Sequence, residues 1–501
     1  MSRHRAGALE VRAGRQESQF GCGAFFWLGD PVTVWRHRRF RLFWTGDTIS
    51  ALGGALSTVA LPLLAIKTLG ATPGQVGVLR SAQTLPFLLF AVPIGLLADR
   101  ISRRRLLLAA DALRFPLVGL IALAGAALGV RALTGLVFVV GVGTVAYEVA
   151  YLSVLPELVD GPAELPAANR AVETAHAGSG LIGPALGGVL VTLLTPAGTV
   201  ALDAISFGVG AALTMVNRWE TVGVAPVRRR LWMAPRKRRT VVVDSAPPST
   251  GRGRSVAAAA PAVDQVGDGP ERGWAASAVD QDGSERGRAA SAVEQDRNEP
   301  ELGRASLLAG WTWLWRDRFV RPMTLYLAVN NLAAQAFQTA LLVFLMVTQH
   351  RSGVAVGLAF AASGAGFLAG AAVSPAAARR FGTGRVIIVA SLLGALGIGV
   401  VAAGGFALVL AGSALAGAGP GLLNLHSIAV RQAITPPGLR GRVNAVVKTI
   451  SYGSATIGAF LGGAVAGASG PRTVIGAAAV VSALATGFPA FSAVRLLRRL
   501  E

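Results

Sequence analysis

Apolar stretches of helical length recur along the whole chain and are separated by short polar connections. A helix of about 20 apolar residues crosses the hydrocarbon core of a bilayer. The pattern predicts twelve spans, at 43–66, 75–98, 106–129, 133–155, 171–195, 199–216, 321–348, 354–378, 385–405, 407–430, 443–467 and 472–494. We therefore expect an all-α integral membrane protein, with twelve transmembrane helices in two six-helix, pseudo-symmetric bundles.

Positive residues gather in every second connection. They include Arg36, Arg38, Arg39 and Arg41 before the first span, Arg228, Arg229, Arg230, Arg236, Lys237, Arg238 and Arg239 after the sixth, and Arg431, Arg440 and Arg442 after the tenth. The alternate connections hold only Lys67, Arg131, Arg351 and Arg472. Cytoplasmic connections of membrane proteins carry the excess of Lys and Arg. The alternation predicts an even number of spans and cytoplasmic termini.

Composition agrees with a membrane protein. Of the 501 residues, 52% are hydrophobic and 15% are charged, whereas soluble proteins carry about 25% charged residues. The net charge of +21 would suggest nucleic acid as the partner of a soluble protein. Here the charges lie between spans and in tails, so we expect a lipid bilayer and no nucleic acid. Arg outnumbers Lys 44 to 3, a bias expected of a high-GC bacterial genome, which points to a bacterial plasma membrane.

The polar segments set the domain boundaries. We expect a cytoplasmic tail at 1–41, the first bundle at 42–216, a linker at 217–304, an entry helix with the second bundle at 305–496, and a cytoplasmic tail at 497–501. The linker contains a tandem duplication and is rich in Arg, Ser, Ala, Asp and Gly, which predicts disorder. Residues 305–318 form an amphipathic pattern whose tryptophans suit a membrane interface. The single cysteine of the chain, Cys22, lies in the N-terminal tail, so no internal disulfide is possible.

The two halves contain related segments. "NRAVETAHAGSGLIGPALGGVL" begins at Asn169, and "NAVVKTISYGSATIGAFLGGAV" begins at Asn444. At the constant offset of 275, several polar residues and most glycines coincide. A second match relates "WRHRRFR" at 35–41 to "WRDRFVR" at 315–321. Related halves imply a binding site between them and alternating access by rocking of one half against the other.

Several motifs resemble those of the major facilitator superfamily. "GLLADRISRRR" is similar to the superfamily's motif between helices two and three, in which Ser102 replaces the usual glycine. Its matching residues are Gly95, Asp99, Arg100, Arg103 and Arg104. "GPALGG" resembles the antiporter motif of helix five, with Gly183, Pro184, Gly187 and Gly188 packing the helix closely. "LPELV", "LDAISF" and "RQAITPPGLRGRVNAV" resemble the drug-exporter branch that includes macrolide and enterobactin exporters.

The resemblance implies a conformational latch at the motif. In the superfamily's geometry, Asp99 would lie beside the start of helix eleven, near 441–444, and accept hydrogen bonds from free backbone N–H groups. Asp111 and Arg114 would extend this charge network. Such a latch would hold the outward-facing state. The alternative is that the arginines only fix the topology.

Polar residues inside the spans are candidates for the transport site, because an ionised group there costs about 2.5–3.5 kcal/mol to insert. Glu148 and Asp47 are the proton-coupling candidates, since burial favours a neutral carboxyl group that can take up and release a proton. The alternatives are a structural carboxyl group for Glu148 and a solvated helix cap for Asp47. The resemblance implies a cavity lined by helices one, four, seven and ten, where the candidates are Tyr147, Tyr151, Ser50, Asn330, Asn331, Gln335, Gln338, Asn424 and His426.

Four further residues have two possible roles. Glu173 and Lys448 occupy matching positions in the halves and would form an inner gate or simply face loop charges. Asp203 is expected to stabilise the start of its helix or to pack against a neighbouring helix. His176, like His426, is expected to be a packing residue rather than a proton relay.

These patterns favour a transporter. The sequence holds no nucleotide-binding loop, metal-ligand cluster or nucleophile–base motif, so we expect no enzymatic activity, no cofactor and no metal. The main hypothesis is a monomeric, proton-coupled antiporter for efflux of a small amphipathic molecule, such as a drug, antibiotic or siderophore-like metabolite, as in multidrug resistance. The alternatives are a lipid or lysolipid flippase and a non-transporting membrane scaffold or sensor.

Overall fold

A computed structural model describes residues 33–98, 100–161, 163–217 and 305–496. The chain divides into two units, one made of 1–225 with 307–501 and the other of 226–306. The duplicated segment and nearly all of the second unit lie outside the described residues, as do the tails at 1–32 and 497–501. The expected disorder of the linker therefore stays a prediction.

Long helices follow the predicted spans in both halves, and the described residues contain no strand. The N-terminal half consists of α1 (Arg38–Lys67), α2 (Pro73–Ala98), α3 (Arg103–Ala124), α4 (Val130–Leu158), α5 (Leu165–Leu194) and α6 (Pro196–Val216). The C-terminal half consists of α9 (Val320–Val343), α10 (Gly353–Phe381), α11 (Thr383–Ala402), α12 (Phe406–Ile434), α13 (Arg440–Ser469), α14 (Pro471–Ala485) and α15 (Gly487–Ala490). The short helix α8 (Ala305–Arg316) lies where the sequence places the entry helix.

Eleven helices of the described residues are long and apolar enough to cross a membrane. They correspond to all predicted spans except 443–467, where the structure has the 30-residue helix α13. A 30-residue helix is about 45 Å long, which exceeds the hydrocarbon core. Its first half is polar, because it contains Lys448 and Tyr452 among several hydroxyl residues. The twelve-span, two-bundle architecture stays a prediction.

Local sequence signals account for the sharp connections between helices. Gly382 and Gly470 have φ values of 85°, which suits glycine, and each joins two helices without an intervening loop. The Ser352 hydroxyl accepts a hydrogen bond from the backbone N–H of Ala355 at the start of α10. The Asp317 carboxylate accepts from the backbone N–H groups of Phe319 and Val320 and so caps α9.

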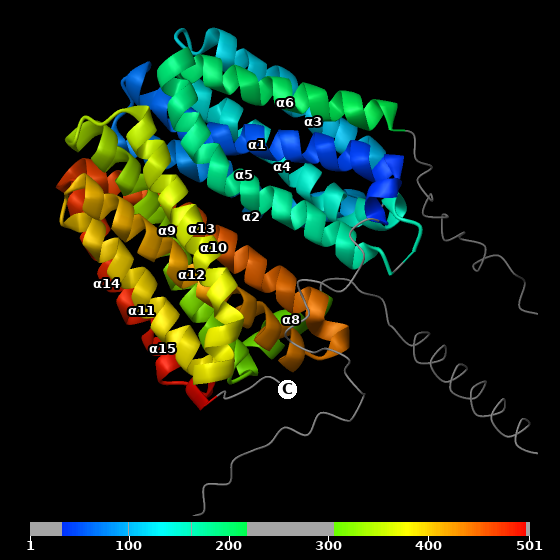
Figure 1. Cartoon of the computed structure of the whole chain (residues 1–501), viewed down its shortest axis with the longest axis vertical. Coiled ribbons are helices and arrows are strands. Elements are labelled where there is room, and N and C mark those ends of the chain that lie inside the picture. Colours follow the sequence, from blue (N-terminus) through cyan, green and yellow to red (C-terminus); the bar gives the residue numbers. More distant parts are fainter. Residues whose placement is uncertain (1–32, 99, 162, 218–304, 497–501) are drawn as a thin grey trace, which may run out of the picture. The chain divides into compact units, whose positions relative to one another are not determined.

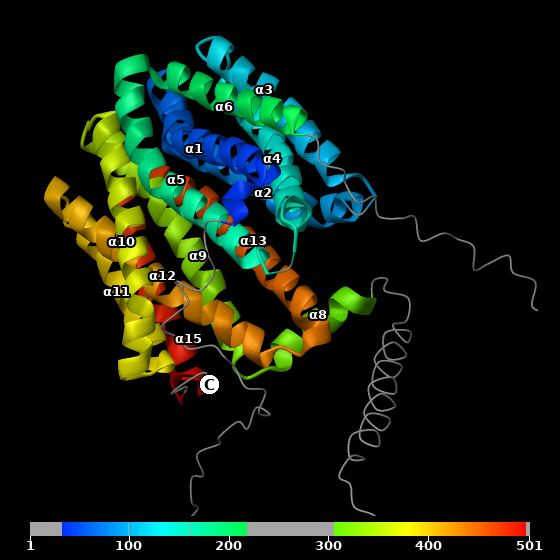
Figure 2. The same cartoon turned by 45° about the vertical axis from the view of Figure 1, so that its right-hand side comes forward.

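Each half has its own packing pattern. In the N-terminal half, α1 packs against α5 and α6, α3 packs against α4 and α6, and α2 packs against α4. In the C-terminal half, α12 packs against α10 and α11, and α9 packs against α13 and α14. Figures 1 and 2 show the blue-to-green helices α1–α6 as one group and the green-to-red helices as another. The two groups meet where α2 packs against α13 and α5 against α10.

The internal repeat has a structural counterpart. The bounds of α5 and α13 coincide at the same offset of 275 that relates their sequences. In α5, Gly187 approaches the backbone of α1 in its own half, and Gly188 approaches α10 in the other half. In α13, Gly462 approaches α9 in its own half, and Gly463 approaches α2 in the other half. Each of these helices therefore packs against both its own half and the opposite one.

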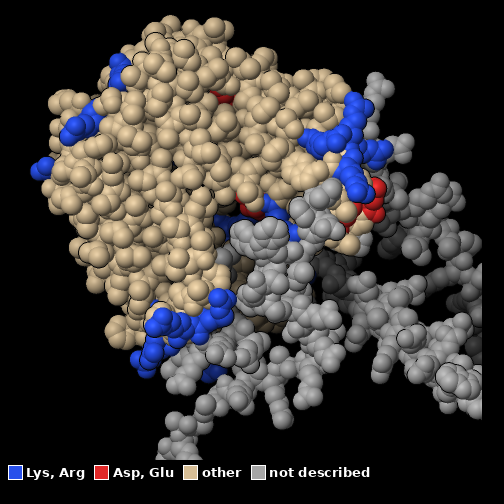
Figure 3. All heavy atoms as spheres, in the orientation of Figure 1, with Lys and Arg blue, Asp and Glu red and all other residues tan. Residues whose placement is uncertain are grey.

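Many of the exposed charged residues lie near the ends of the helices. In Figure 3 most of the face in view is uncharged, Lys and Arg gather toward its edges, and a few charged atoms are visible nearer the middle. An apolar belt between charged ends is the surface expected for a protein that crosses a bilayer.

Candidate functional site

The two halves are in close contact at one end, which we call the closed end: the Pro73 end of α2, the Ser469 end of α13, the Leu194 end of α5 and the Gly353 end of α10. A Cβ atom at Gly77 would lie 2.7 Å from the Cα atom of Gly463, so only glycine permits this approach. Nearby, the Ser81 hydroxyl donates to the backbone carbonyl of Thr456 over 3.0 Å. The Thr84 and Thr456 hydroxyls lie 2.9 Å apart. Direct polar contacts therefore seal this end.

At the opposite end, which we call the open end, polar side chains on the facing helices are accessible. Glu173 of α5 and Lys448 of α13 are both exposed, as are their neighbours Thr174 and Thr449. The last cross-half ring contact before this end is the stack of Phe87 on Tyr452, with centroids 4.6 Å apart. The hydrogen bonds that join described residues of one half to described residues of the other all lie on the closed side of this stack. The direct contacts between the halves therefore lie away from this end, where the facing helices leave polar side chains exposed.

A buried carboxylate organises a polar cluster inside the N-terminal half. Asp47 of α1 accepts hydrogen bonds from the Tyr147 hydroxyl of α4, over 3.0 Å, and from Nε2 of His176 of α5, over 2.8 Å. The side chain is 2% exposed, so it is not a solvated cap. The ring of Tyr151 packs edge-on against His176. The sequence selected Asp47 and both tyrosines but missed His176 as their partner, because it lies 129 residues from Asp47.

An arginine lies beside this carboxylate. Arg114 of α3 forms an ion pair with Asp111 one turn earlier, and both side chains are buried. Its guanidinium carbon lies 4.4 Å from the centre of the Tyr147 ring and 4.2 Å from that of Phe207. Arg114 thus contacts the Asp47 cluster through Tyr147. Asp111 and Arg114 form a buried pair inside the N-terminal half, and their expected link to the Asp99 latch stays a prediction.

Glu148 faces the C-terminal half. It is half-buried on α4 and interacts electrostatically with Lys448, His176 and Arg114. Lys448 is the only member of this set on the C-terminal half. The sequence paired Lys448 with Glu173 as a gate, whereas in this structure Glu173 interacts electrostatically with Tyr151 and His176 on its own half. The charge of Glu148 therefore acts on a residue of the opposite half.

The polar residues predicted for the C-terminal wall have different surroundings. Gln338 of α9 accepts a hydrogen bond from Arg80 of α2 across the closed end. Asn330 accepts from the Ser482 hydroxyl of α14, and His426 contacts the Ser374 hydroxyl of α10 over 2.9 Å. These last two contacts pack helices within the C-terminal half. Of the other predicted cavity residues, Asn331 and Gln335 are half-buried, Asn424 is exposed and Ser50 is buried.

The predicted latch is only partly described. Asp99 lies outside the described residues, so the latch stays a prediction. Arg103 forms an ion pair with Glu157 of α4 over 2.7 Å. Arg104 donates to three backbone carbonyls at the end of α6, where a cation stabilises the helix terminus. Gly95 is half-buried and Arg100 is exposed. These arginines therefore bind the N-terminal half together at its open end.

The four residues singled out in the GPALGG segment of α5 are closely packed. Gly183, Pro184, Gly187 and Gly188 are all buried. A Cβ atom at Gly183 would lie 2.3 Å from that of Ala55 in α1. The motif holds α5 against α1 on one side and against α10 on the other.

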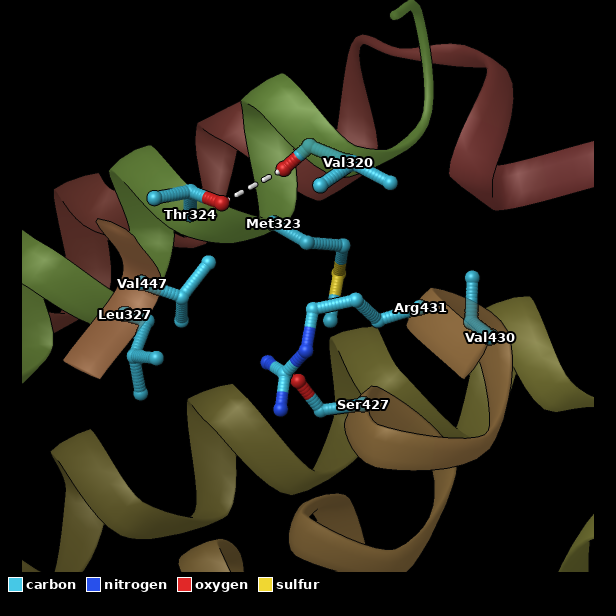
Figure 4. Close-up of a pocket in the computed structure, with 8 residues that line it drawn as sticks. All are labelled: Val320, Met323, Thr324, Leu327, Ser427, Val430, Arg431 and Val447. Carbon is cyan, nitrogen blue, oxygen red and sulfur yellow. Dashed lines mark hydrogen bonds between the residues drawn. The ribbon is translucent and has the colours of Figure 1, made fainter. Parts of the chain in front are cut away.

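A small cavity lies near the open end of the C-terminal half. In Figure 4 the guanidinium of Arg431 lies beside Ser427, facing Met323 of α9. The Arg431 Nε atom donates to the Asn444 side-chain oxygen over 2.7 Å. The cavity has a volume of about 10 Å³, which is room for about one water molecule. It is too small for an organic substrate.

Comparison with known families decides the class of the chain. Residues 30–233 match the family model described as transmembrane secretion effector, one of the major facilitator models, and residues 323–499 match the Major Facilitator Superfamily model. Both halves are major facilitator domains. The matches and the fold make the chain a multi-pass membrane transporter of the major facilitator type. A comparison with curated proteins gives no significant match.

Solved transporter structures share the fold of this major facilitator chain. The nucleoside transporter NupG superposes with a TM-score of 0.60 at 10% identity, covering 90% of this chain and 98% of that one. A POT family transporter in complex with 5-aminolevulinic acid superposes with a TM-score of 0.62 at 13% identity, covering 90% of this chain and 94% of that one. A bacterial homologue of the iron transporter ferroportin in an inward-facing state superposes with a TM-score of 0.58 at 13% identity, covering 90% of this chain and 98% of that one. At these identities the likeness shows the fold alone.

Proposed function

We propose that the protein is a proton-coupled exporter of small amphipathic organic molecules that works by alternating access. The description of the family matched by the N-terminal half, a secretion effector, supports the outward direction. The open end is the end with the arginine-rich connections after α2 and α12, which supports a cytoplasmic location for it. In this orientation the structure is inward-facing and ready to load from the cytoplasm.

The position of Glu148 carries the coupling proposal. It lies beside the Asp47–His176 pair and interacts electrostatically with Lys448 on the opposite half. A negative Glu148 attracts Lys448, and a protonated Glu148 does not. Protonation therefore changes the interaction between the halves, which is the property that a coupling residue needs. His176 is a second group close enough to exchange a proton with Asp47.

The cavity wall supports an amphipathic substrate. Tyr147 and Tyr151 stack with their ring centroids 6.4 Å apart on the N-terminal side, and Tyr452 is half-buried on the C-terminal side. Aromatic surfaces with a few polar groups are typical of sites for small organic molecules. The substrate would place its apolar part against these rings.

Transport in everted membrane vesicles with an imposed pH gradient tests the proposal. The probes are labelled amphipathic compounds of negative, zero and positive charge. Glu148→Gln keeps the size of the side chain and removes its titration. We expect pH-driven transport to be lost while binding of the transported probe persists.

Asp160→Asn is the matched control, because Asp160 is an acid of the same half whose side chain is 87% exposed. It should transport like the parent protein. Undiminished pH-driven transport by Glu148→Gln would contradict the coupling role. If lysolipid is moved and no probe is, the flippase alternative replaces the exporter.

A further inference from the structure

Arg80 of α2 is a buried cation that the transport scheme above does not use. It lies two turns inside the closed end of α2 and is 8% exposed. Within the part of the chain that the structure describes, it has no acidic partner at ion-pair distance. The other buried arginine, Arg114, is paired with Asp111. An isolated charge inside a membrane protein is expensive and indicates a function.

The surroundings of Arg80 satisfy only some of the hydrogen-bond donors of its guanidinium group. Nη2 donates to the Gln338 side-chain oxygen over 3.2 Å, and the guanidinium carbon lies 6.0 Å from the centre of the Phe360 ring. Both neighbours belong to the C-terminal half. Nη1 is buried and has no hydrogen-bond partner. A guanidinium group offers paired donors that match a carboxylate or phosphate group.

We propose that Arg80 binds an anionic group of the transported molecule, so that the substrate is an amphipathic organic anion or zwitterion. This inference rests on the proposed transport function and specifies its substrate class. Thr84 and Phe87 follow Arg80 at one and two turns on the same helix, so the anion site continues into an apolar, aromatic surface. The aromatic part of the substrate would lie along that surface.

The same geometry indicates when the anion binds. In the present state the contact between the halves encloses Nη1, so the site is inaccessible. Gln338 and Phe360 lie on the opposite half, and opening of the closed end removes them from Arg80. The freed guanidinium then pairs with the anionic group of the substrate. As this end closes again, the two side chains return and displace the anion toward the outside.

Binding of matched compounds to the purified full-length protein tests the proposal. The probes are phenylacetic, indoleacetic and naphthaleneacetic acids, each paired with its primary amide. The readout is the unfolding temperature of the protein, measured at increasing concentrations of each probe. We expect at least one acid to bind more tightly than its amide. Arg80→Gln should weaken binding of that acid by about tenfold or more and leave the amide unchanged.

Two further variants separate recognition from structure. Arg80→Lys keeps the charge and should retain part of the preference for the acid. Arg131→Gln removes an exposed arginine from the closed end and should retain all of it. If Arg80 only fastened the halves together through Gln338, Arg80→Gln would lower the unfolding temperature without ligand and affect acid and amide equally.

The proposal is overturned if no acid binds more tightly than its amide, or if the preference survives in Arg80→Gln. Proton-driven export of a cationic probe by both the parent and Arg80→Gln would overturn the anion site and leave the exporter function intact. Failure of the exporter itself is detected separately by the Glu148→Gln vesicle experiment.

Discussion

The role of a single polar residue inside a helix depends on partner residues that are far away in the sequence. Asp203 lies in α6, within the second turn after Pro196, and its carboxylate accepts a hydrogen bond from the Ser57 hydroxyl of α1. The Asp203 side chain is buried, and the neighbouring Ser206 hydroxyl donates to its backbone carbonyl. This geometry agrees with the packing role expected of Asp203. The pair joins α1 to α6 in the interior of the N-terminal half.

Replacement of Ser57 tests that role. Ser57→Ala removes a hydrogen bond to a buried carboxylate, and the expected loss is about 1–3 kcal/mol of stability. Thr58→Ala is the control, because Thr58 is exposed and donates only to the backbone of its own helix; it should change stability by less than about 0.5 kcal/mol. The unfolding temperature in detergent measures both. Equal effects of the two variants would contradict the packing role of Asp203.

The positions of the helices were largely predictable, whereas their polar partners were not. The lengths of the apolar stretches located the helices, and the offset of 275 residues between the related segments correctly paired α5 with α13. The Asp47–His176 hydrogen bond joins residues of different helices, and no periodic pattern encodes such a pair. Arg80 was missed although it is a lone charge within a predicted apolar span. That signal could have been used, because the insertion cost applies to every span and not only to those that line the cavity.

At the scale of elements, glycines decide how closely the halves approach. A Cβ atom at Gly77 of α2 would lie 2.9 Å from the backbone oxygen of Ala459 in α13, in addition to its clash with Gly463. At Gly74, one turn earlier, a Cβ atom would meet nothing within 4 Å. The two glycines therefore form a matched pair on one helix.

Gly77→Ala should push the closed ends of α2 and α13 apart. Overpacking costs about 1–3 kcal/mol, which corresponds to a shift of roughly 5- to 150-fold between the conformations. Gly74→Ala should cause no shift. Distances between spin labels at the exposed positions Gln75 and Ser469, after replacement of Cys22, report the populations. An unchanged distance distribution in Gly77→Ala would show that this contact does not control the closed state.

At the scale of the whole transporter unit, the central claim is that the closed end must open during each cycle. The symmetric packing of α5 and α13 supports rocking of one half about the other, because each helix contacts both halves through adjacent glycines. The predicted Asp99 latch would stabilise the complementary state, in which the opposite end is shut. Together the two ends would give alternating access.

A reversible cross-link at the closed end tests this claim most directly. A Cβ atom at Gly467 would lie 3.9 Å from the Cβ atom of Pro73, a separation that suits a disulfide between cysteines at the two positions. In a protein with Cys22 replaced, oxidation of the pair Pro73→Cys and Gly467→Cys should abolish transport in vesicles, and reduction should restore it. Each single cysteine variant should transport equally before and after oxidation. Transport at the full rate by the cross-linked protein would contradict alternating access through this contact.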